Sequence, residues 1–208
     1  MANLFITATG TDIGKTYITC QIARYLNDTK QNYQVLKPII SGFEGNKTDT
    51  HKLANISGQT IAQTSLYKLK AALSPDVAAK QEGVEINYNK IIDFCKPKAN
   101  QYNIVEGVGG VYVPIDGEHT ILDLIKDLNY KTILIVGNYL GSISHTLSAY
   151  NNLKAVNITP VIIINETNTN PPCSTDEMME SIKNHVGCDV FNHKLGGYSS
   201  KLYQTLLK

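Results

Sequence analysis

Short runs of apolar, β-branched residues alternate with amphipathic segments along the chain. The runs are continuous, as expected for strands that are buried on both faces of a parallel sheet. Alternation of such strands with helices predicts an α/β fold with a mostly parallel central sheet and helices on both faces. The pattern predicts five strands and a weaker sixth, at Asn3–Thr7, Gln34–Ile40, Tyr102–Val105, Thr132–Val136, Thr159–Ile164 and Asp189–Phe191.

The amphipathic segments predict the helices. Ser174 is followed three residues later by Glu177, and Thr120 by Asp123, which is the spacing of a capping box at a helix start. No repeat, charge run or low-complexity tract divides the chain, so we expect one domain spanning residues 1–208. The predicted helices are Lys15–Leu26, Asp49–Ile56, Tyr88–Cys95, Ile121–Leu128, His145–Val156, Thr175–His185 and Lys201–Leu207.

Composition narrows the class of protein. A chain of 208 residues fits one domain, and 19 basic against 18 acidic residues leave a net charge of +1. This balance argues against nucleic-acid binding, which relies on a clustered basic surplus. The apolar runs are too short to span a membrane, and the N-terminus lacks the pattern of a signal peptide. Four widely spaced cysteines suggest neither disulfides nor a zinc site, so we expect a cytoplasmic protein.

The stretch from Thr9 to Thr16 follows the first strand and opens the first helix, as a phosphate-binding loop does. It departs from the strict pattern because Thr9 occupies the place of the first glycine. The groups that meet phosphate are nevertheless present, since Gly14 permits close approach, Lys15 adds a positive charge and Thr16 can ligate Mg²⁺. An ordinary strand-turn-helix corner is the alternative. The loop favours a three-layer fold of the P-loop NTPase type.

Two carboxylates complete a possible metal site. Glu106 follows an apolar strand, where a nucleotide site needs a metal-binding carboxylate, although a solvated carboxylate also fits this position. Asn46-Lys47-Thr48-Asp49 resembles the guanine-recognition tetrapeptide of GTPases. We reject guanine specificity because that motif follows a late strand, whereas this one lies soon after the second. Asp49 is kept as a second metal carboxylate.

Four blocks of sequence resemble the dethiobiotin synthetase family. They are Thr9-Gly10-Thr11-Asp12-Ile13-Gly14-Lys15-Thr16, Leu36-Lys37-Pro38-Ile39-Ile40-Ser41-Gly42, Val105-Glu106-Gly107-Val108-Gly109-Gly110 and Leu134-Ile135-Val136-Gly137-Asn138-Tyr139-Leu140-Gly141. The resemblance runs from Phe5 to about Asn165. It implies an ATP- and Mg²⁺-dependent ligase of biotin biosynthesis. Such an enzyme adds CO₂ to 7,8-diaminopelargonate, phosphorylates the carbamate and closes the ring to dethiobiotin.

The resemblance also implies roles for individual residues. Lys37, Lys15 and Thr11 correspond to catalytic positions, and Thr16, Asp49 and Glu106 to the Mg²⁺ site. The substrate contacts implied are Thr11, Asp12, Lys37, Ser41, Gly141, Ser142 and Ser144. The nucleotide contacts implied are Asp12, Ile13, Gly14, Lys15, Thr16, Tyr17, Asp49, Glu106, Gly107, Val108, Gly109, Asn165, Glu166, Asn192, His193 and Lys194.

Members of the family work as homodimers. The resemblance therefore implies that the carboxylate-bearing tail of 7,8-diaminopelargonate lies at the dimer interface. We expect its carboxylate to bind at the start of the partner subunit's helix, which opens at Gly141. His145 is more consistent with a helix-end hydrogen bond than with catalysis. Three positions depart from the family pattern. Ala8 stands where many members have glycine, Ser144 where asparagine is familiar, and Met178 where tyrosine is.

Three other functions are typical of chains with a loop of this kind. Amide synthetases with a related loop also carry a glutaminase domain, for which 208 residues leave no room. Positioning ATPases of the ParA/MinD type begin their loop with Lys-Gly-Gly, and Ala8-Thr9-Gly10 lacks that lysine. A nucleotide-binding module without chemistry would give Lys37 and Ser41 no role.

Overall fold

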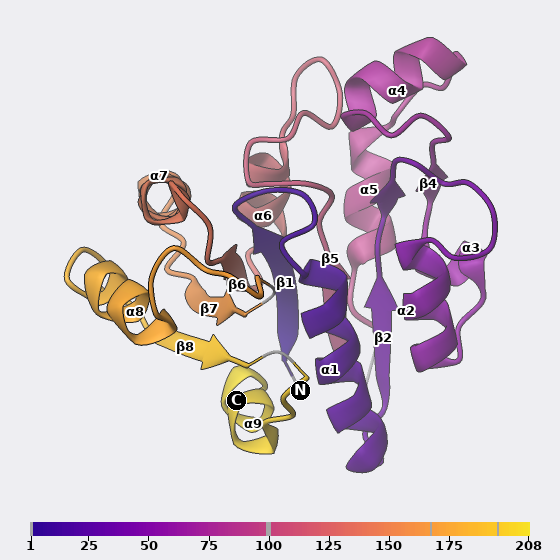
Figure 1. Ribbon diagram of the computed structural model, residues 1–208. Coiled ribbons are helices and arrows are strands. Elements are labelled where there is room, and N and C mark those ends of the chain that lie inside the picture. Colours follow the sequence, from indigo (N-terminus) through magenta and orange to yellow (C-terminus); the bar gives the residue numbers. More distant parts are fainter. Residues whose placement is uncertain (1, 99–100, 167, 195) are drawn as a thin grey trace.

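A six-stranded sheet forms the centre of the molecule (Figure 1). The computed structural model describes residues 2–98, 101–166, 168–194 and 196–208. The sheet order is β2-β5-β1-β6-β7-β8, and each neighbouring pair is parallel. This arrangement confirms the predicted α/β fold, including the weak last strand. The strands are β1 (Asn3–Ala8), β2 (Tyr33–Leu36), β5 (Tyr102–Glu106), β6 (Lys131–Gly137), β7 (Val161–Asn165) and β8 (Val190–His193).

Helices cover both faces of the sheet and form the outer two of three layers. Leu4 and Ile6 of β1 pack on one face, in a core shared with α1, α2 and α9, while Phe5 faces the opposite core. Side chains alternate between the faces of a strand, so one apolar run contributes to both cores. The first face carries α1 (Lys15–Asp28), α2 (Asp49–Ser57) and α9 (Ser200–Leu206), and the second α5 (Tyr88–Cys95), α6 (Ile121–Leu128), α7 (Ser142–Ala155) and α8 (Thr175–Lys183).

Both expected capping boxes are present. The Glu177 carboxylate accepts the Ser174 N–H at 2.8 Å, and the Asp123 carboxylate accepts the Thr120 N–H at 2.8 Å. These bonds satisfy donors that the first turn of a helix leaves without a partner. Within the described ranges, no helix combines the length and apolar character needed to cross a membrane.

The strand predicted at Gln34–Ile40 is wrong in its second half. β2 ends at Leu36, and Ile39–Ile40 forms a separate strand, β3, that pairs in parallel with β4 (Tyr67–Lys68). Pro38 causes the break because it has no N–H for the sheet ladder, and its carbonyl instead accepts the N–H groups of Leu66 and Tyr67. The interruption leaves the preceding lysine, Lys37, just after the end of the edge strand β2, next to the end of β5.

Two shifted boundaries and two missed helices also correct the sequence interpretation. The helix expected at His145–Val156 begins three residues earlier, at Ser142, and β7 starts at Val161 because Pro160 precedes it. Two short helices were missed, α3 (Ile61–Thr64) and α4 (Pro75–Glu82). The first is a single turn, and the second buries only Pro75 and two alanines, so neither has an apolar stripe that a periodicity can reveal.

Candidate active site

The loop between β1 and α1 leads into the first turn of α1, whose backbone N–H groups can bind an anion. Gly14 adopts φ 99° immediately before the helix, a left-handed conformation that favours glycine. The Lys15 side chain is buried, and its Nζ donates to the Gly10 carbonyl at 2.8 Å. From the far end of the sheet, Asn165 Nδ2 donates to the Ile13 carbonyl at 3.0 Å. These contacts hold the loop in the form of an anion site.

Glu106, at the end of β5, joins the loop to β2. Its Oε1 atom accepts from Thr16 Oγ1 at 2.6 Å and from Lys37 Nζ at 2.7 Å. The Glu106 side chain is fully buried, Lys37 is almost so, and Glu106 Oε2 has no partner. A buried carboxylate oxygen without a hydrogen bond is costly, so Oε2 is suited to a ligand such as a metal ion.

Asp49, the first residue of α2, contributes a second carboxylate from the opposite wall. Its Oδ1 atom accepts from Lys52 Nζ at 3.1 Å. Burial raises the pKa of Asp49, but the charge of Lys37 and hydrogen bonds from Lys52 and Thr16 outweigh this effect and hold the pKa below its usual range. The last residue of the tetrapeptide Asn46-Lys47-Thr48-Asp49 therefore lies beside Thr16 of the phosphate loop, a position that suits a metal ligand.

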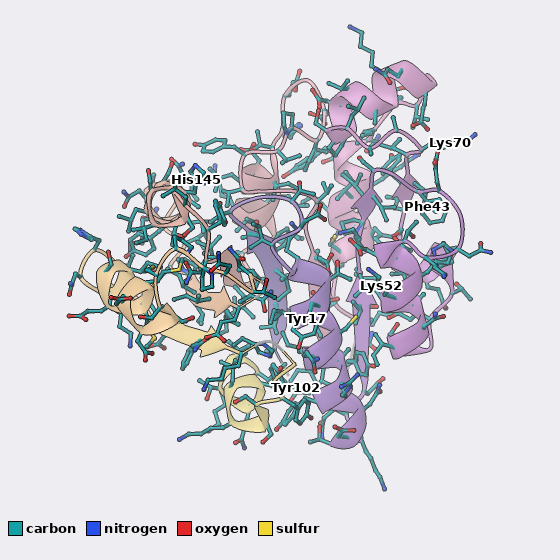
Figure 2. All side chains as sticks on the ribbon, in the orientation of Figure 1. Tyr17, Phe43, Lys52, Lys70, Tyr102 and His145 are labelled. Carbon is teal, nitrogen blue, oxygen red and sulfur yellow. The ribbon has the colours of Figure 1, made fainter. Side chains whose placement is uncertain are left out.

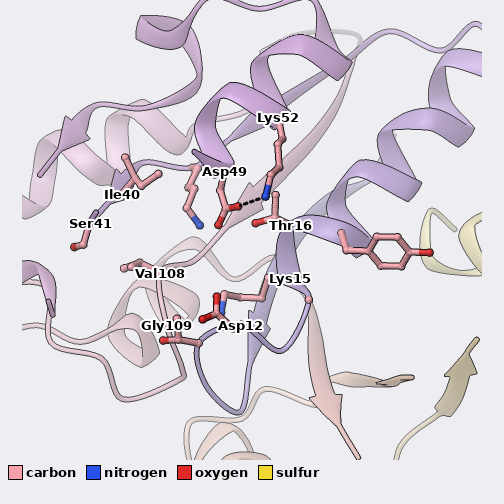
Figure 3. Close-up of a pocket in the computed structure, with 13 residues that line it drawn as sticks. Asp12, Lys15, Thr16, Ile40, Ser41, Asp49, Lys52, Val108 and Gly109 are labelled. Atoms are coloured by element: carbon pink, nitrogen blue, oxygen red, sulfur yellow. Dashed lines mark hydrogen bonds and ion pairs between the residues drawn. The ribbon is translucent and has the colours of Figure 1, made fainter. Parts of the chain in front are cut away.

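The loop, Lys37 and Asp49 line one cavity of about 270 Å³ (Figure 3), whereas Glu106 is fully buried and is not a lining residue. Three lysines and the carboxylates of Asp12 and Asp49 line it, together with Thr11 and Ser41. Ser41 Oγ is buried without a partner, so it too is free to bind a substrate group. The cavity brings together most of the loop and carboxylate residues that the sequence singled out: Thr11, Asp12, Gly14, Lys15, Thr16, Tyr17, Lys37, Ser41, Asp49, Val108 and Gly109. Lys52 and Ile40 also line it and were not singled out.

The donor set fits Mg²⁺. The described residues contain no cluster of three carboxylate, imidazole or thiol groups, but Mg²⁺ commonly uses one or two carboxylates and completes its shell with water and substrate phosphate. Thr16, Asp49 and Glu106 offer a hydroxyl and two carboxylates, and Glu106 Oε2 lacks a partner. The residues present therefore fit the group that the sequence implied.

Burial of Lys15 affects its protonation. Burial, and next the positive charge of Lys37, lower the pKa of Lys15 to about 8. The carboxylates of Glu106, Asp49 and Asp12 act in the opposite direction. Near pH 8 the loop therefore exists in two charge states, and only one of them attracts phosphate strongly.

Binding of ADP without metal is expected to take up protons near pH 8. At that pH about half of Lys15 is neutral, and a bound phosphate favours the charged form. ADP affinity should consequently fall as pH rises above this pKa and show no Lys15 effect well below it. Calorimetry in two buffers with different ionisation enthalpies measures the uptake. A proton uptake of zero at pH 8 would contradict the shifted pKa.

Gly109 lets the glycine-rich segment after β5 approach the cavity. Its φ is +61°, and an added Cβ would lie 2.5 Å from Val113 Cγ2. A side chain here is therefore excluded twice, by the backbone conformation and by the contact.

The substitution Gly109→Ala is expected to reduce the free energy of unfolding by about 2 kcal/mol through strain and overpacking. Chemical denaturation measures this loss. The double variant Gly109→Ala/Val113→Ala should recover only that part of the lost free energy of unfolding that is due to the contact between the added Cβ and Val113. Equal stabilities of Gly109→Ala and the unchanged protein would refute the steric argument.

The residues expected at the base of the nucleotide lie beyond α1, at the ends of β7 and β8. Asn165 is fully buried, and its Oδ1 atom has no partner. His193 is also buried, lies edge-on to the Tyr17 ring and contacts the Tyr203 hydroxyl through Nε2 at 2.7 Å. Asn192 Nδ2 donates to the Glu166 carboxylate at 2.9 Å, while Lys194 is exposed. Of these residues only Tyr17 also lines the phosphate cavity.

The segment from Gly141 to Ser144 starts α7, outside the phosphate cavity. Gly141 and Ser144 are exposed, whereas the Ser142 hydroxyl is buried and points at Met178 Sδ, 3.9 Å away. A second cavity of about 470 Å³ lies between α7 and the phosphate loop. His145 on α7 forms part of its wall (Figure 2). Its Nδ1 atom lies 2.9 Å from the Tyr139 hydroxyl, so His145 has a local hydrogen-bond partner.

Solved structures share the fold. A ParA family ATPase from Chlorobium tepidum superposes with a TM-score of 0.58 at 15% identity, covering 99% of this chain and 87% of that one. The MinD cell division protein of Aquifex aeolicus gives a TM-score of 0.54 at 13% identity, covering 99% and 86%. At these identities the likeness supports the three-layer P-loop NTPase fold alone.

Proteins with similar sequences identify the family of this chain more specifically than the solved structures do. A family model described as an AAA domain matches residues 2–193. The chain is 32% identical to the ATP-dependent dethiobiotin synthetase BioD of Acidiphilium cryptum, covering 90% of this chain and 89% of that protein. It is 36% identical to the protein of the same name from Cytophaga hutchinsonii, covering 93% and 88%. With this similarity along nearly the whole chain, the protein is an enzyme that belongs to the ATP-dependent dethiobiotin synthetase family.

Proposed function

We propose that this enzyme forms dethiobiotin from 7,8-diaminopelargonate, CO₂ or bicarbonate, and ATP, as a ligase of biotin biosynthesis. One observation carries the proposal. Glu106 bonds both Thr16 of the phosphate loop and Lys37 at the end of β2, and so places a second cation beside the phosphate site. A nucleotide-binding module has no need of that cation. One domain spanning residues 1–208 supplies all these groups.

The reaction has three balanced steps. One amine of the diamine attacks CO₂ and loses a proton, which gives a carbamate. A carbamate oxygen then attacks the γ-phosphorus of ATP, the bond to the β-phosphate oxygen breaks, and ADP leaves. Finally the second amine attacks the carbonyl carbon of the carbamic-phosphoric anhydride, loses a proton and expels phosphate. Negative charge accumulates at every stage, so placed cations and N–H donors provide the catalysis.

The two buried lysines of the cavity, Lys15 and Lys37, have distinct tasks. Lys15 and the N–H groups at the start of α1 bind the β- and γ-phosphates, while Lys37 binds the carbamate and the transferring phosphoryl group. Thr11, Asp12 and Ser41 on the rim bind the diamine and the carbamate. A neighbouring cavity of about 320 Å³ shares Thr11 and Ser41 and has apolar walls that suit hydrocarbon.

Thr16, Asp49 and Glu106 would hold Mg²⁺, which when bound neutralises phosphate charge and orients the triphosphate. At the other end of the nucleotide, Asn165 Oδ1 offers an acceptor for an exocyclic amino group of the base. We assign the remaining contacts with the nucleotide to the phosphate loop and α1, to the glycine-rich segment after β5, and to the ends of β7 and β8. They are Ile13, Tyr17, Gly107, Val108, Gly109, Glu166, Asn192, His193 and Lys194.

Incubation with 7,8-diaminopelargonate, bicarbonate and Mg-ATP tests the function directly. Mass spectrometry should detect dethiobiotin, with one ADP formed for each product molecule. A reaction that lacks only the diamine is the control. ATP hydrolysis without dethiobiotin, over a range of diamine concentrations, would refute the proposal.

We further propose a homodimer that shares its active sites. Leu140 is 90% exposed directly before Gly141, and Tyr112 is 57% exposed on the wall of the second cavity, which α7 also lines. Large apolar side chains at this exposure are typical of a contact surface. The first turn of the partner's α7 would then receive the substrate carboxylate through its N–H groups.

Mixed dimers test this shared site. Ser144→Glu places a negative charge where the carboxylate is proposed to bind, and Ser144 is exposed, so folding should be unaffected. Alone, Ser144→Glu and Lys37→Ala should each be inactive. A random equal mixture should recover roughly a quarter of the normal rate, because half of the dimers contain one intact site out of two. Absence of recovery in verified mixed dimers would rule out sharing.

A further inference from the structure

Both carboxylates proposed to hold the metal, Glu106 and Asp49, are paired with a lysine that lines the phosphate cavity. Glu106 Oε1 lies 2.7 Å from Lys37 Nζ, and Asp49 Oδ1 lies 3.1 Å from Lys52 Nζ. The proposed function uses Lys37 and Lys15 but gives Lys52 no task. Yet Lys52 lines the same cavity, and Figure 3 shows its side chain reaching Asp49 beside Thr16.

Lys52 differs from the other two lysines in its freedom to move. Lys15 and Lys37 are buried, and each donates a hydrogen bond to an oxygen, Lys15 to the Gly10 carbonyl and Lys37 to the Glu106 carboxylate. The Lys52 side chain is 60% exposed and lies one helical turn after Asp49. Exposed pairs of this spacing contribute little stability, so the Lys52 ammonium group can leave Asp49 at small cost.

A divalent cation on Asp49 would compete with Lys52. Two positive charges cannot share one carboxylate oxygen without repulsion, so the metal displaces the weaker and more mobile partner. The triphosphate of the nucleotide would lie next to this point and carries several negative charges. Arginine cannot serve there, because the single arginine, Arg24, is absent from the cavity lining.

We propose that Lys52 is a third phosphate-binding cation, which exchanges Asp49 for the terminal phosphate of the nucleotide when a divalent cation binds. This inference rests on the proposed nucleotide and metal site. It makes Lys52 a residue that distinguishes a triphosphate from a diphosphate. Because of this exchange, binding of the metal to Asp49 and binding of the γ-phosphate by Lys52 occur together.

The variant Lys52→Met tests both halves of the exchange. Without nucleotide, Mn²⁺ should bind several-fold more tightly to Lys52→Met, because its competitor for Asp49 is gone. With Mg²⁺, the affinity for a non-hydrolysable ATP analogue should fall about tenfold, while that for ADP changes less than about twofold. Lys52→Arg retains the charge and should restore the preference for triphosphate.

Lys96→Met is the matched control. Lys96, directly after the last residue of α5, forms an ion pair with Asp93 at the same spacing, at 2.6 Å, and does not line the cavity. Its removal should change neither Mn²⁺ nor nucleotide binding. Unchanged Mn²⁺ affinity in Lys52→Met would overturn the inference, as would equal losses for the ATP analogue and ADP.

Failure of the proposed function gives a different result. If the unchanged protein binds the ATP analogue but makes no dethiobiotin, the assigned reaction is wrong while the measurements on Lys52 still decide the exchange. If it binds neither nucleotide, both the site and the exchange are refuted.

Discussion

Lys37→Ala is expected to abolish dethiobiotin formation while leaving nucleotide binding within about tenfold of normal. Lys15 and the N–H groups of the phosphate loop remain in the variant, so the phosphates keep their main contacts. The cation assigned to the carbamate and the transferring phosphoryl group is lost, and we expect kcat to fall at least about a thousandfold. Single-turnover product formation and ADP titration measure the two effects separately.

Removal of Lys37 also leaves Glu106 fully buried without its ion-pair partner. Breaking a buried pair in this way costs about 3 kcal/mol of stability. Lys37→Gln is therefore a second variant, because its amide can donate to Glu106 and preserve the fold. Lys96→Ala, which removes an exposed lysine outside the cavity, is the control. Normal turnover by a folded Lys37→Gln variant would show that the role given to Lys37 is wrong.

Glu106→Gln should remove most of the advantage that Mg²⁺ gives to nucleotide binding. Glutamine has nearly the volume of glutamate, so the packing at the end of β5 is kept while one charge is lost. In the absence of metal, ADP should bind as tightly as before or more tightly, because a negative charge has left the phosphate site. With Mg²⁺, kcat should fall about a hundredfold or more. Calorimetry measures the affinity for ADP with and without Mg²⁺, and the ratio of the two affinities gives the contribution of the metal.

Asp49→Asn is the matched comparison for Glu106→Gln. Asp49 is partly exposed, so its loss should act in the same direction with a smaller effect on binding. Glu118→Gln, on an exposed turn before α6, should change nothing. If Mg²⁺ strengthens ADP binding equally in the unchanged protein and in Glu106→Gln, Glu106 is not a metal ligand.

Local patterns revealed the sheet and most of the helices because burial imposes a period on neighbouring residues. The same reasoning failed where chain geometry rather than burial decides. Pro38 diverts the chain after Leu36 although the apolar run continues to Ile40. The helix Pro75–Glu82 was missed because its buried side chains are small.

The phosphate loop was predictable since its backbone, lysine and threonine act within one turn of a helix. The expected partners of that loop were named by resemblance. Only the structure shows that Thr16 and Lys37 meet on the same oxygen of Glu106, 90 and 69 residues away in the chain. Lys52 gave no signal of its own, because a lysine three residues after an aspartate is common on helix surfaces.

The sequence alone therefore determined the alternation of strands and helices, the anion site at the start of α1 and the family. These features depend on residues close together in the chain. The tertiary structure decided which carboxylate each lysine pairs with, that Ser142 faces Met178, and that Asn165 supports Ile13 across 152 residues. Such contacts follow from strand order and register, which bring distant segments to one edge of the sheet and leave no periodic trace in the sequence.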